Sequence, residues 1–174
     1  MTQSATPTHP SPRPHVSFGQ ALKNWRKYMF RFSGRASRSE FWWVMLVWFI
    51  ISLVLSIIAL VAIVPTFNHL QQLQEAASTS LDAYNEYRQA SNELGPALAG
   101  KTLIFALIIG VFGIVQFVTM LGLWWRRLQD ANFHGAFYLL SFAGPGALVP
   151  LIMAILPSNP AGVRFDKPED ATRP

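Results

Sequence analysis

Three long apolar stretches without a charged side chain dominate the hydrophobic pattern of this 174-residue chain. They are Phe41–Val64, Thr102–Trp125 and Gly135–Pro157. A helix needs roughly 20 apolar residues to cross a bilayer core about 30 Å thick, and each stretch reaches that length. A soluble protein of this size could bury one such helix but not three. The pattern therefore predicts an all-α integral membrane protein with three transmembrane helices over residues 41–64, 102–125 and 135–157.

The third stretch differs from the other two because Gly144-Pro145-Gly146 and Pro150 lie inside it. Proline removes a backbone donor and kinks a helix, although neighbouring helices can satisfy the freed carbonyls. We expect a kinked crossing rather than a re-entrant hairpin, because 23 residues are few for entering the membrane and returning. A crossing would place the tail 158–174, expected to be flexible, on the outer side.

The segment before the first span has two parts. Residues 1–16 contain four Pro and no apolar periodicity, so we expect them to be disordered. Residues 17–32 place apolar side chains at helical steps and basic side chains on other faces, behind a capping-box spacing. This predicts an N-terminal amphipathic interfacial helix, ended by a left-handed cap at Gly34. The alternative is a basic helix that satisfies the topology rule but packs on nothing.

The connector 65–101 is long and polar, with apolar residues at steps of three or four. We expect a helical loop made of extensions of the first two spans, broken by the Ser/Thr cluster at 78–80 and ending at Gly95-Pro96. Together with the spans and the amphipathic helix, this connector completes a membrane domain over residues 17–157.

Charge sets the expected orientation. Residues 1–40 hold seven Lys or Arg against one acid, whereas residues 65–101 hold two against four. Cytoplasmic loops of membrane proteins carry the excess of Lys and Arg. The N-terminus is therefore expected in the cytoplasm, the connector 65–101 outside, and the short loop 126–134 in the cytoplasm. These features predict a multi-pass membrane protein.

Tryptophans flank the same predicted interface. Trp and Tyr are enriched where a helix leaves the hydrocarbon. Five tryptophans lie at the cytoplasmic ends of the predicted helices and are candidate interfacial anchors: Trp25, Trp42, Trp43, Trp124 and Trp125.

The segment from Phe32 to Trp43, with the sequence FSGRASRSEFWW, resembles the opening signature of a bacterial inner-membrane family known as domain of unknown function 805. The resemblance continues at Arg126-Arg-Leu-Gln-Asp130 before Gly135, and more weakly at Arg164-Phe165. This chain has Gln129 where the family typically has His, and Asp166 where it typically has Gly. The family has no established activity, so the resemblance implies a fold and a location but no reaction.

Charged residues at the cytoplasmic rim form the candidate site. If the predicted topology holds, they lie at one depth beside a low-dielectric boundary. We expect Glu40 to pair with Arg126 or Arg127, and Asp130 to pair with Arg35 or Arg38. The alternative is a set of separate solvated charges that only obeys the topology rule. The rim residues are Gly34, Arg35, Arg38, Glu40, Arg126, Arg127 and Asp130.

Catalytic chemistry finds little support in the sequence. The four His are scattered over a tail and two loops, and cysteine is absent, so no metal site is expected. No phosphate loop or nucleophile motif is present, and no ionisable residue lies within a predicted span. We therefore expect no catalytic residue and no cofactor.

The sequence favours a non-enzymatic membrane protein that acts through lipid or protein contacts at its cytoplasmic rim. Its expected partners are anionic lipid headgroups, with a homo-oligomer or a membrane protein as further candidates and no nucleic acid. The alternative is a subunit of an oligomeric transporter or channel, with the Gly/Pro-broken third span lining the path.

Overall fold

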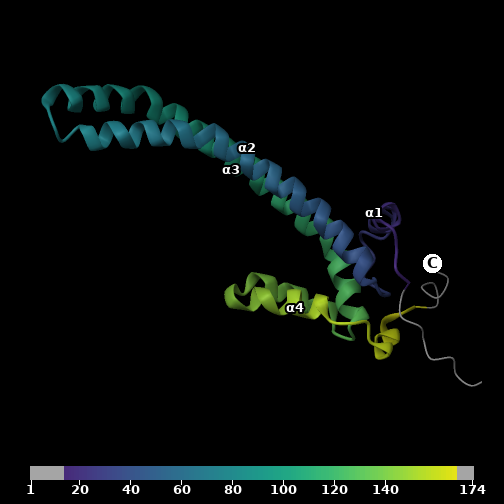
Figure 1. The fold of residues 1–174 in the computed structure, drawn as a ribbon. Coiled ribbons are helices and arrows are strands. Elements are labelled where there is room, and N and C mark those ends of the chain that lie inside the picture. The colour runs from purple at the N-terminus through teal and green to yellow at the C-terminus, as the bar shows by residue number, and fades with distance from the viewer. Residues whose placement is uncertain (1–13, 168–174) are drawn as a thin grey trace, which may run out of the picture. The chain divides into compact units, whose positions relative to one another are not determined.

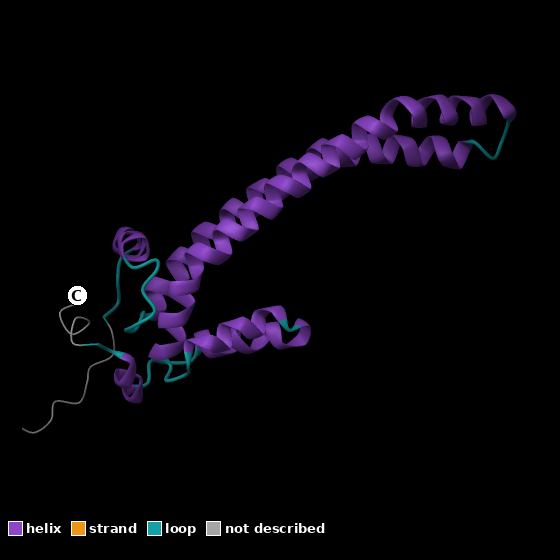
Figure 2. Cartoon of the chain, turned by 180° about the vertical axis from the view of Figure 1, so that it is seen from behind, coloured by secondary structure: helices purple, strands orange, loops and turns teal. Residues whose placement is uncertain are grey.

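The computed structural model describes residues 14–167, and every regular element in that range is a helix (Figures 1 and 2). The prediction of an all-α chain is therefore confirmed. Of the segment 1–16 that was expected to be disordered, residues 1–13 lie outside the described range, while Val16 is buried and its amide donates to the Ser39 hydroxyl at 2.9 Å. In chain order the elements are α1 (Phe18–Lys27), α2 (Arg38–Ala76), α3 (Leu81–Asp130), the 3-10 helices η1 (Gly135–Phe142) and η2 (Gly144–Ala147), α4 (Leu148–Ile155) and the 3-10 helix η3 (Pro160–Phe165).

The chain divides into two compact units, and the first to consider is Phe49–Val115. It consists of the later part of α2 and the earlier part of α3, joined by residues 77–80 (Figure 1). The Ser/Thr cluster breaks the helix as predicted: the Thr79 hydroxyl donates to the Ala76 carbonyl at 2.7 Å, and the Ser80 hydroxyl accepts from the Ala83 amide at 3.1 Å.

The expected helix end at Gly95-Pro96 is wrong, because α3 runs through both residues. Proline removes one backbone donor from a helix, and the apolar sequence that follows from Thr102 is long enough to sustain the helix beyond it.

Two helices, α2 and α3, are long and apolar enough to cross a membrane. The core helix of a soluble protein would be mostly buried, but only 6% of the most apolar window of each helix is buried within the protein. Large apolar side chains therefore cover their surfaces, as expected of helices whose solvent is hydrocarbon. The third predicted transmembrane helix is absent from the part of the chain that the structure describes.

The second unit contains residues 14–48 and 116–167 and begins with α1. The Ser17 hydroxyl caps this helix by accepting from the Gln20 amide at 3.4 Å, as the capping-box spacing predicts. The helix ends at Lys27 rather than at Phe32. Gly34 has the predicted left-handed backbone, with φ of 84°, but it does not cap α1.

One face of α1 packs on the beginning of α2 and the end of α3. The Phe18 ring meets the Trp43 ring edge-on at 5.6 Å. Trp25 donates its indole N–H to the Thr119 carbonyl at 3.0 Å and contacts the Trp48 ring at 6.0 Å. A helix that packs on nothing is therefore ruled out, and the apolar periodicity of residues 17–32 reports intramolecular packing.

The segment 135–157 does not form the single kinked helix that the sequence predicted. The segment forms η1, a turn at η2 and the short helix α4, and η1 and α4 lie side by side (Figures 1 and 2). We call residues 135–157 the short hairpin. Gly144 has a φ of 57°, a left-handed conformation that glycine adopts without strain. The Gly-Pro-Gly sequence therefore reverses the chain instead of kinking one helix.

Both ends of the short hairpin lie beside the last turn of α3. The Asn159 amide, just beyond α4, donates to the Asp130 carbonyl at 2.8 Å. The tail, expected to be flexible from residue 158, contains the 3-10 helix η3 in the described range.

Candidate functional site

The three sequence motifs meet within one unit of the structure, and backbone hydrogen bonds join them. The Ala36 amide donates to the Arg126 carbonyl at 3.1 Å, which ties the first motif to the second. The Gly34 amide donates to the Phe165 carbonyl at 3.1 Å, which ties the first to the third. We call the charged and polar side chains gathered there the motif cluster: Arg35, Glu40, Arg126, Arg127, Gln129, Asp130, Ser158 and Asp166.

Local backbone geometry places these segments. After α3 ends at Asp130, Asn132 adopts a φ of 67°, and the Phe133 amide returns to the Leu128 carbonyl at 2.9 Å. This is a Schellman-type ending, and it turns the chain sharply into the short hairpin. In η3, a Cβ atom on Gly162 would lie 2.4 Å from the Gln129 carbonyl oxygen. Only glycine therefore lets the third motif approach α3 this closely.

The predicted pairing of Glu40 across the motifs is confirmed. Its carboxylate accepts from Nη1 of Arg126 at 2.9 Å, and the two side chains are 8% and 1% exposed. Glu40 lies in the first turn of α2, where the helix dipole also favours a carboxylate. The Ser37 hydroxyl caps this turn by accepting from the Glu40 amide at 3.3 Å. The guanidinium carbon of Arg126 lies 5.8 Å from the Tyr28 ring centroid, so a cation–π contact extends the pair to the residue after α1.

Arg127 connects more segments than any other side chain of the cluster. It is fully buried. Its Nε donates to the Ala154 carbonyl at 2.9 Å, Nη2 donates to the Leu156 carbonyl, and Nη1 donates to the Ala36 carbonyl at 3.4 Å and to the Asp130 carboxylate. The last carbonyls of a helix have no partner within the helix. Arg127 supplies that partner at the end of α4 and holds the returning arm of the short hairpin against α3.

Asp130 does not pair with an arginine of the first motif, so that prediction is wrong. Its ion-pair partner is Arg127, three residues earlier on the same helix, and the Ser158 hydroxyl donates to the same carboxylate oxygen. A spacing of three residues places two side chains on one helix face, which makes the local pair geometrically easy. Burial raises the pKa of the Asp130 carboxyl, and the Ser158 hydrogen bond and the charge of Arg127 act against that rise.

The two arginines expected to pair with Asp130 have different environments. Arg35 is buried, and its Nε and Nη2 both lie 3.0 Å from one carboxylate oxygen of Asp166, directly after η3. Arg38 is exposed at the beginning of α2. Asp166 and Ser158 were absent from the predicted rim because sequence reasoning placed the tail across the membrane. Once the short hairpin returns, Asp166, the residue after the third motif, becomes an available partner for Arg35.

The five candidate tryptophan anchors differ in their exposure and packing. Trp42 and Trp43 are 38% and 36% exposed, as an interfacial position requires. Trp124 is buried between the Phe41 and Tyr138 rings, at centroid distances of 4.7 and 5.0 Å, so it is a packing residue. A Cβ on Gly135 would lie 2.2 Å from the half-buried Trp125 ring, which therefore packs against the start of η1. Trp25 packs within the protein, as described for α1.

The motif cluster is built for holding segments together. Gln129, at the position where the family typically has His, donates to the Phe32 carbonyl at 3.2 Å. Among the described residues there is no group of three or more His, Asp or Glu side chains that could hold a metal ion. Most polar contacts of the cluster join a side chain to a different segment of the chain, so the cluster holds segments together, while Nε and Nη2 of Arg126 are buried without a hydrogen-bond partner in the described part of the chain.

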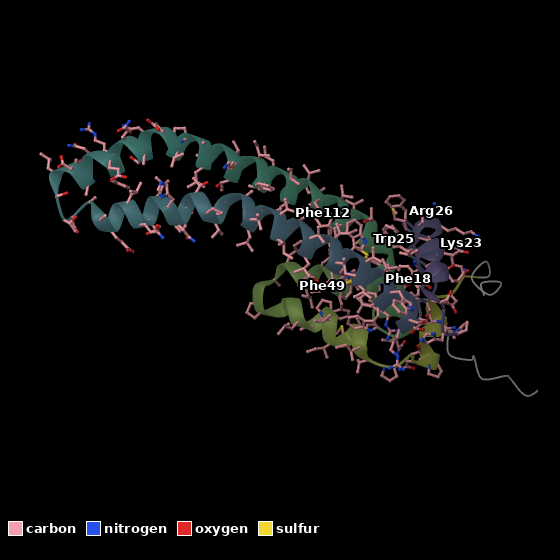
Figure 3. All side chains as sticks on the ribbon, turned by 45° about the horizontal axis from the view of Figure 1, so that its top comes forward. Phe18, Lys23, Trp25, Arg26, Phe49 and Phe112 are labelled. Atoms are coloured by element: carbon pink, nitrogen blue, oxygen red, sulfur yellow. The ribbon has the colours of Figure 1, made fainter. Side chains whose placement is uncertain are left out.

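Exposed positive charges lie outside the motif cluster, and three of them are on α1. Lys23, Arg26 and Lys27 are exposed on the side of α1 that does not carry its packing contacts. Figure 3 shows Lys23 and Arg26 pointing outward while Phe18 and Trp25 point toward the long helices. The buried arginines of the predicted rim therefore hold the motifs together, whereas the exposed cations of α1, predicted as the basic face of the amphipathic helix, face the surroundings.

A family model described as "Protein of unknown function (DUF805)" matches residues 29–167, a range that contains all three motifs. Comparisons with curated proteins and with solved structures gave no match.

Proposed function

The chain belongs to the DUF805 family, whose function is unknown, and we propose that it is a non-enzymatic protein of the bacterial inner membrane. In this proposal α2 and α3 cross the membrane, the N-terminus lies in the cytoplasm, and the protein acts by contacting anionic lipid headgroups at its cytoplasmic face. The two long apolar helices and the charge difference between residues 1–40 and 65–101 support this placement.

The observation that carries the lipid proposal is the fixed orientation of α1. Its aromatic side chains are engaged by Trp43, Trp48 and Thr119 at the ends of the long helices. This packing holds Lys23 and Arg26 exposed on the other side (Figure 3). Basic side chains held at the membrane surface attract anionic lipids. Because packing already holds α1 in place, lipid binding does not carry the entropic cost of fixing the position of that helix.

Counting retained lipids tests this proposal. The double variant Lys23→Gln/Arg26→Gln removes two exposed cations from α1. The matched control Arg88→Gln/Lys101→Gln removes one Lys and one Arg, also exposed, from the connector 65–101. Each protein is purified from micelles containing equal phosphatidylglycerol and phosphatidylcholine, and native mass spectrometry counts both lipids per chain.

Wild type and the control should retain phosphatidylglycerol preferentially, while the α1 variant should lose most of that preference, on the order of tenfold. The same preference in all three proteins would contradict a headgroup site on α1. A loss in the control equal to that in the α1 variant would show that only net charge matters.

A second candidate is a subunit of an oligomeric transporter or channel. The short hairpin favours it, because discontinuous helices reversing at a Gly/Pro break line the substrate paths of many transporters. This candidate requires a stable oligomer with water reaching the turn around Gly144. A monomer in mild detergent with a dry turn would leave the lipid proposal as the better account.

A further inference from the structure

The short hairpin carries an inference that rests on the membrane placement in the proposed function and extends it to the third apolar stretch. We propose that residues 135–157 enter the bilayer from the side of the three motifs, reach about its middle, and return to the same side. The partner of the hairpin's outer surface is the hydrocarbon of that one leaflet. The chain would then cross the membrane twice, and residues 158–167 would lie on the same side as residues 14–37.

Both ends of the short hairpin are fixed at one level of α3. At the entering end, Gly135 lies against the Trp125 ring. At the returning end, Arg127 binds the carbonyls of Ala154 and Leu156. A segment that crossed the membrane would have its two ends separated by about 30 Å. Here both ends contact the same last turns of one helix.

Ring contacts along α3 show how deep the turn of the short hairpin would lie in the bilayer. The chain turns back along α3: the Tyr138 ring stacks on Trp124 at 5.0 Å, and the Phe142 ring contacts Phe117 at 5.1 Å. Phe117 lies eight residues before Trp125 on α3, or about 12 Å along the helix axis at 1.5 Å per residue. The turn that follows Phe142 is therefore about half of a 30 Å core away from the level of Trp125.

The length of the segment agrees with this depth. Eight residues of η1 span about 16 Å at the 2.0 Å rise of a 3-10 helix, and eight residues of α4 span about 12 Å. The expectation that 23 residues are too few for entry and return assumed a full crossing in each direction. Half-depth entry needs only this length.

The outer surface of the short hairpin is apolar and uncharged. No Asp, Glu, Lys or Arg occurs between Gly135 and Pro157, and large apolar side chains are exposed on both arms. Soluble proteins rarely expose so large a continuous apolar surface to water. The hairpin lies along residues 116–125 of α3, which belong to the apolar stretch of that helix. The exposed apolar side chains are Phe137, Leu139, Leu140, Phe142, Leu148, Val149, Ile152, Ile155 and Leu156.

Backbone hydrogen bonding is compatible with hydrocarbon. Backbone polar groups need partners within a bilayer. At the turn, the Ala143 amide donates to the Leu140 carbonyl at 2.9 Å, and the Gly146 amide donates to the Ala143 carbonyl at 3.1 Å. Pro145 and Pro150 have no N–H group to satisfy. The reversal therefore leaves few donors that would require water.

Because the sequence contains no cysteine, single cysteines can be introduced into the full chain without background. Three positions are exposed and serve as markers: His15→Cys before α1, Gln72→Cys near the end of α2, and Ala161→Cys in η3. A membrane-impermeant maleimide is applied to intact cells and to inverted membrane vesicles. We expect Ala161→Cys to label from the same side as His15→Cys and from the side opposite to Gln72→Cys. Labelling of Ala161→Cys together with Gln72→Cys would overturn the proposal.

Two further readouts guard against a misfolded variant and test the depth. A fluorescent protein that matures only in the cytoplasm, fused after Pro174, should report the side that His15→Cys reports, and disagreement would overturn the topology. Ala143→Cys at the exposed turn should resist the reagent in both membrane preparations and react in detergent. Reaction of Ala143→Cys in either preparation before detergent would overturn the assignment of hydrocarbon as its surroundings and would favour a water-lined path.

Discussion

Replacing Arg127 tests how much the motif cluster contributes to the fold. Arg127→Gln removes the charge that faces the Asp130 carboxylate and cannot reproduce the contacts to the Ala154, Leu156 and Ala36 carbonyls. Both members of the ion pair are 0% exposed. Removing one partner of such a buried pair costs ~3–5 kcal/mol, because the other charge stays buried without compensation.

The matched control is Arg38→Gln. Arg38 is exposed at the beginning of α2, and an exposed charge contributes only ~0–1 kcal/mol. The free energy of unfolding of each variant is measured in mixed micelles by titration with a denaturing detergent, with helix content followed by circular dichroism. Arg127→Lys should be intermediate, since it keeps the charge but lacks the planar fork that reaches several carbonyls.

The result that would refute this reasoning is an equal loss in Arg127→Gln and Arg38→Gln. The Arg127 contacts would then contribute no more than solvated charges, and the short hairpin would be held by apolar packing alone.

Two further predictions follow from the same structure. In Arg127→Gln, the buried Asp130 carboxyl loses the nearby positive charge that lowers its pKa, so its pKa in the folded state should rise further above the unfolded value. The loss in the free energy of unfolding relative to wild type should therefore shrink as the pH is lowered from 8 to 5. A loss that does not change with pH, or one that remains when Asp130→Asn is added, would contradict this. Gly162→Ala should destabilise the protein by ~1–3 kcal/mol, because its Cβ would meet the Gln129 carbonyl oxygen at 2.4 Å, whereas Gly19→Ala, with nothing within 4 Å, should be neutral or stabilising in thermal unfolding.

The sequence predicted the parts of the fold that depend on local pattern. The apolar lengths of α2 and α3, the cap at Ser17 and the break at residues 78–80 follow from composition and hydrogen-bonding side chains near in sequence. The pairing of Glu40 with Arg126 was also predictable, because both flank long helices that a topology argument places at one depth.

The sequence failed where the outcome depends on which segment returns to which. A Gly-Pro-Gly break inside an apolar stretch permits both a kink and a reversal, and the choice is made by Arg127 at carbonyls 27 and 29 residues away. That return brought the third motif to Arg35, so Asp166 became its partner, and Asp130 was left with Arg127. The reversal of residues 135–157 therefore accounts both for the pairing of Asp130 with Arg127 and for the position of η3 beside α3.

A double-mutant cycle on Glu40 and Arg126 is the most direct test of whether the charged residues of the first two motifs stabilise the fold by pairing with each other inside the protein. The free energy of unfolding is measured for wild type, Glu40→Gln, Arg126→Gln and the double variant, alongside a parallel cycle of Glu40 with the exposed Arg88, which lies 38 residues before Arg126 on α3. We predict a coupling energy of ~0.5–3 kcal/mol for the pair at 2.9 Å and additivity within ~0.5 kcal/mol for the control cycle. Strict additivity in the first cycle, or equal coupling in both, would contradict the account.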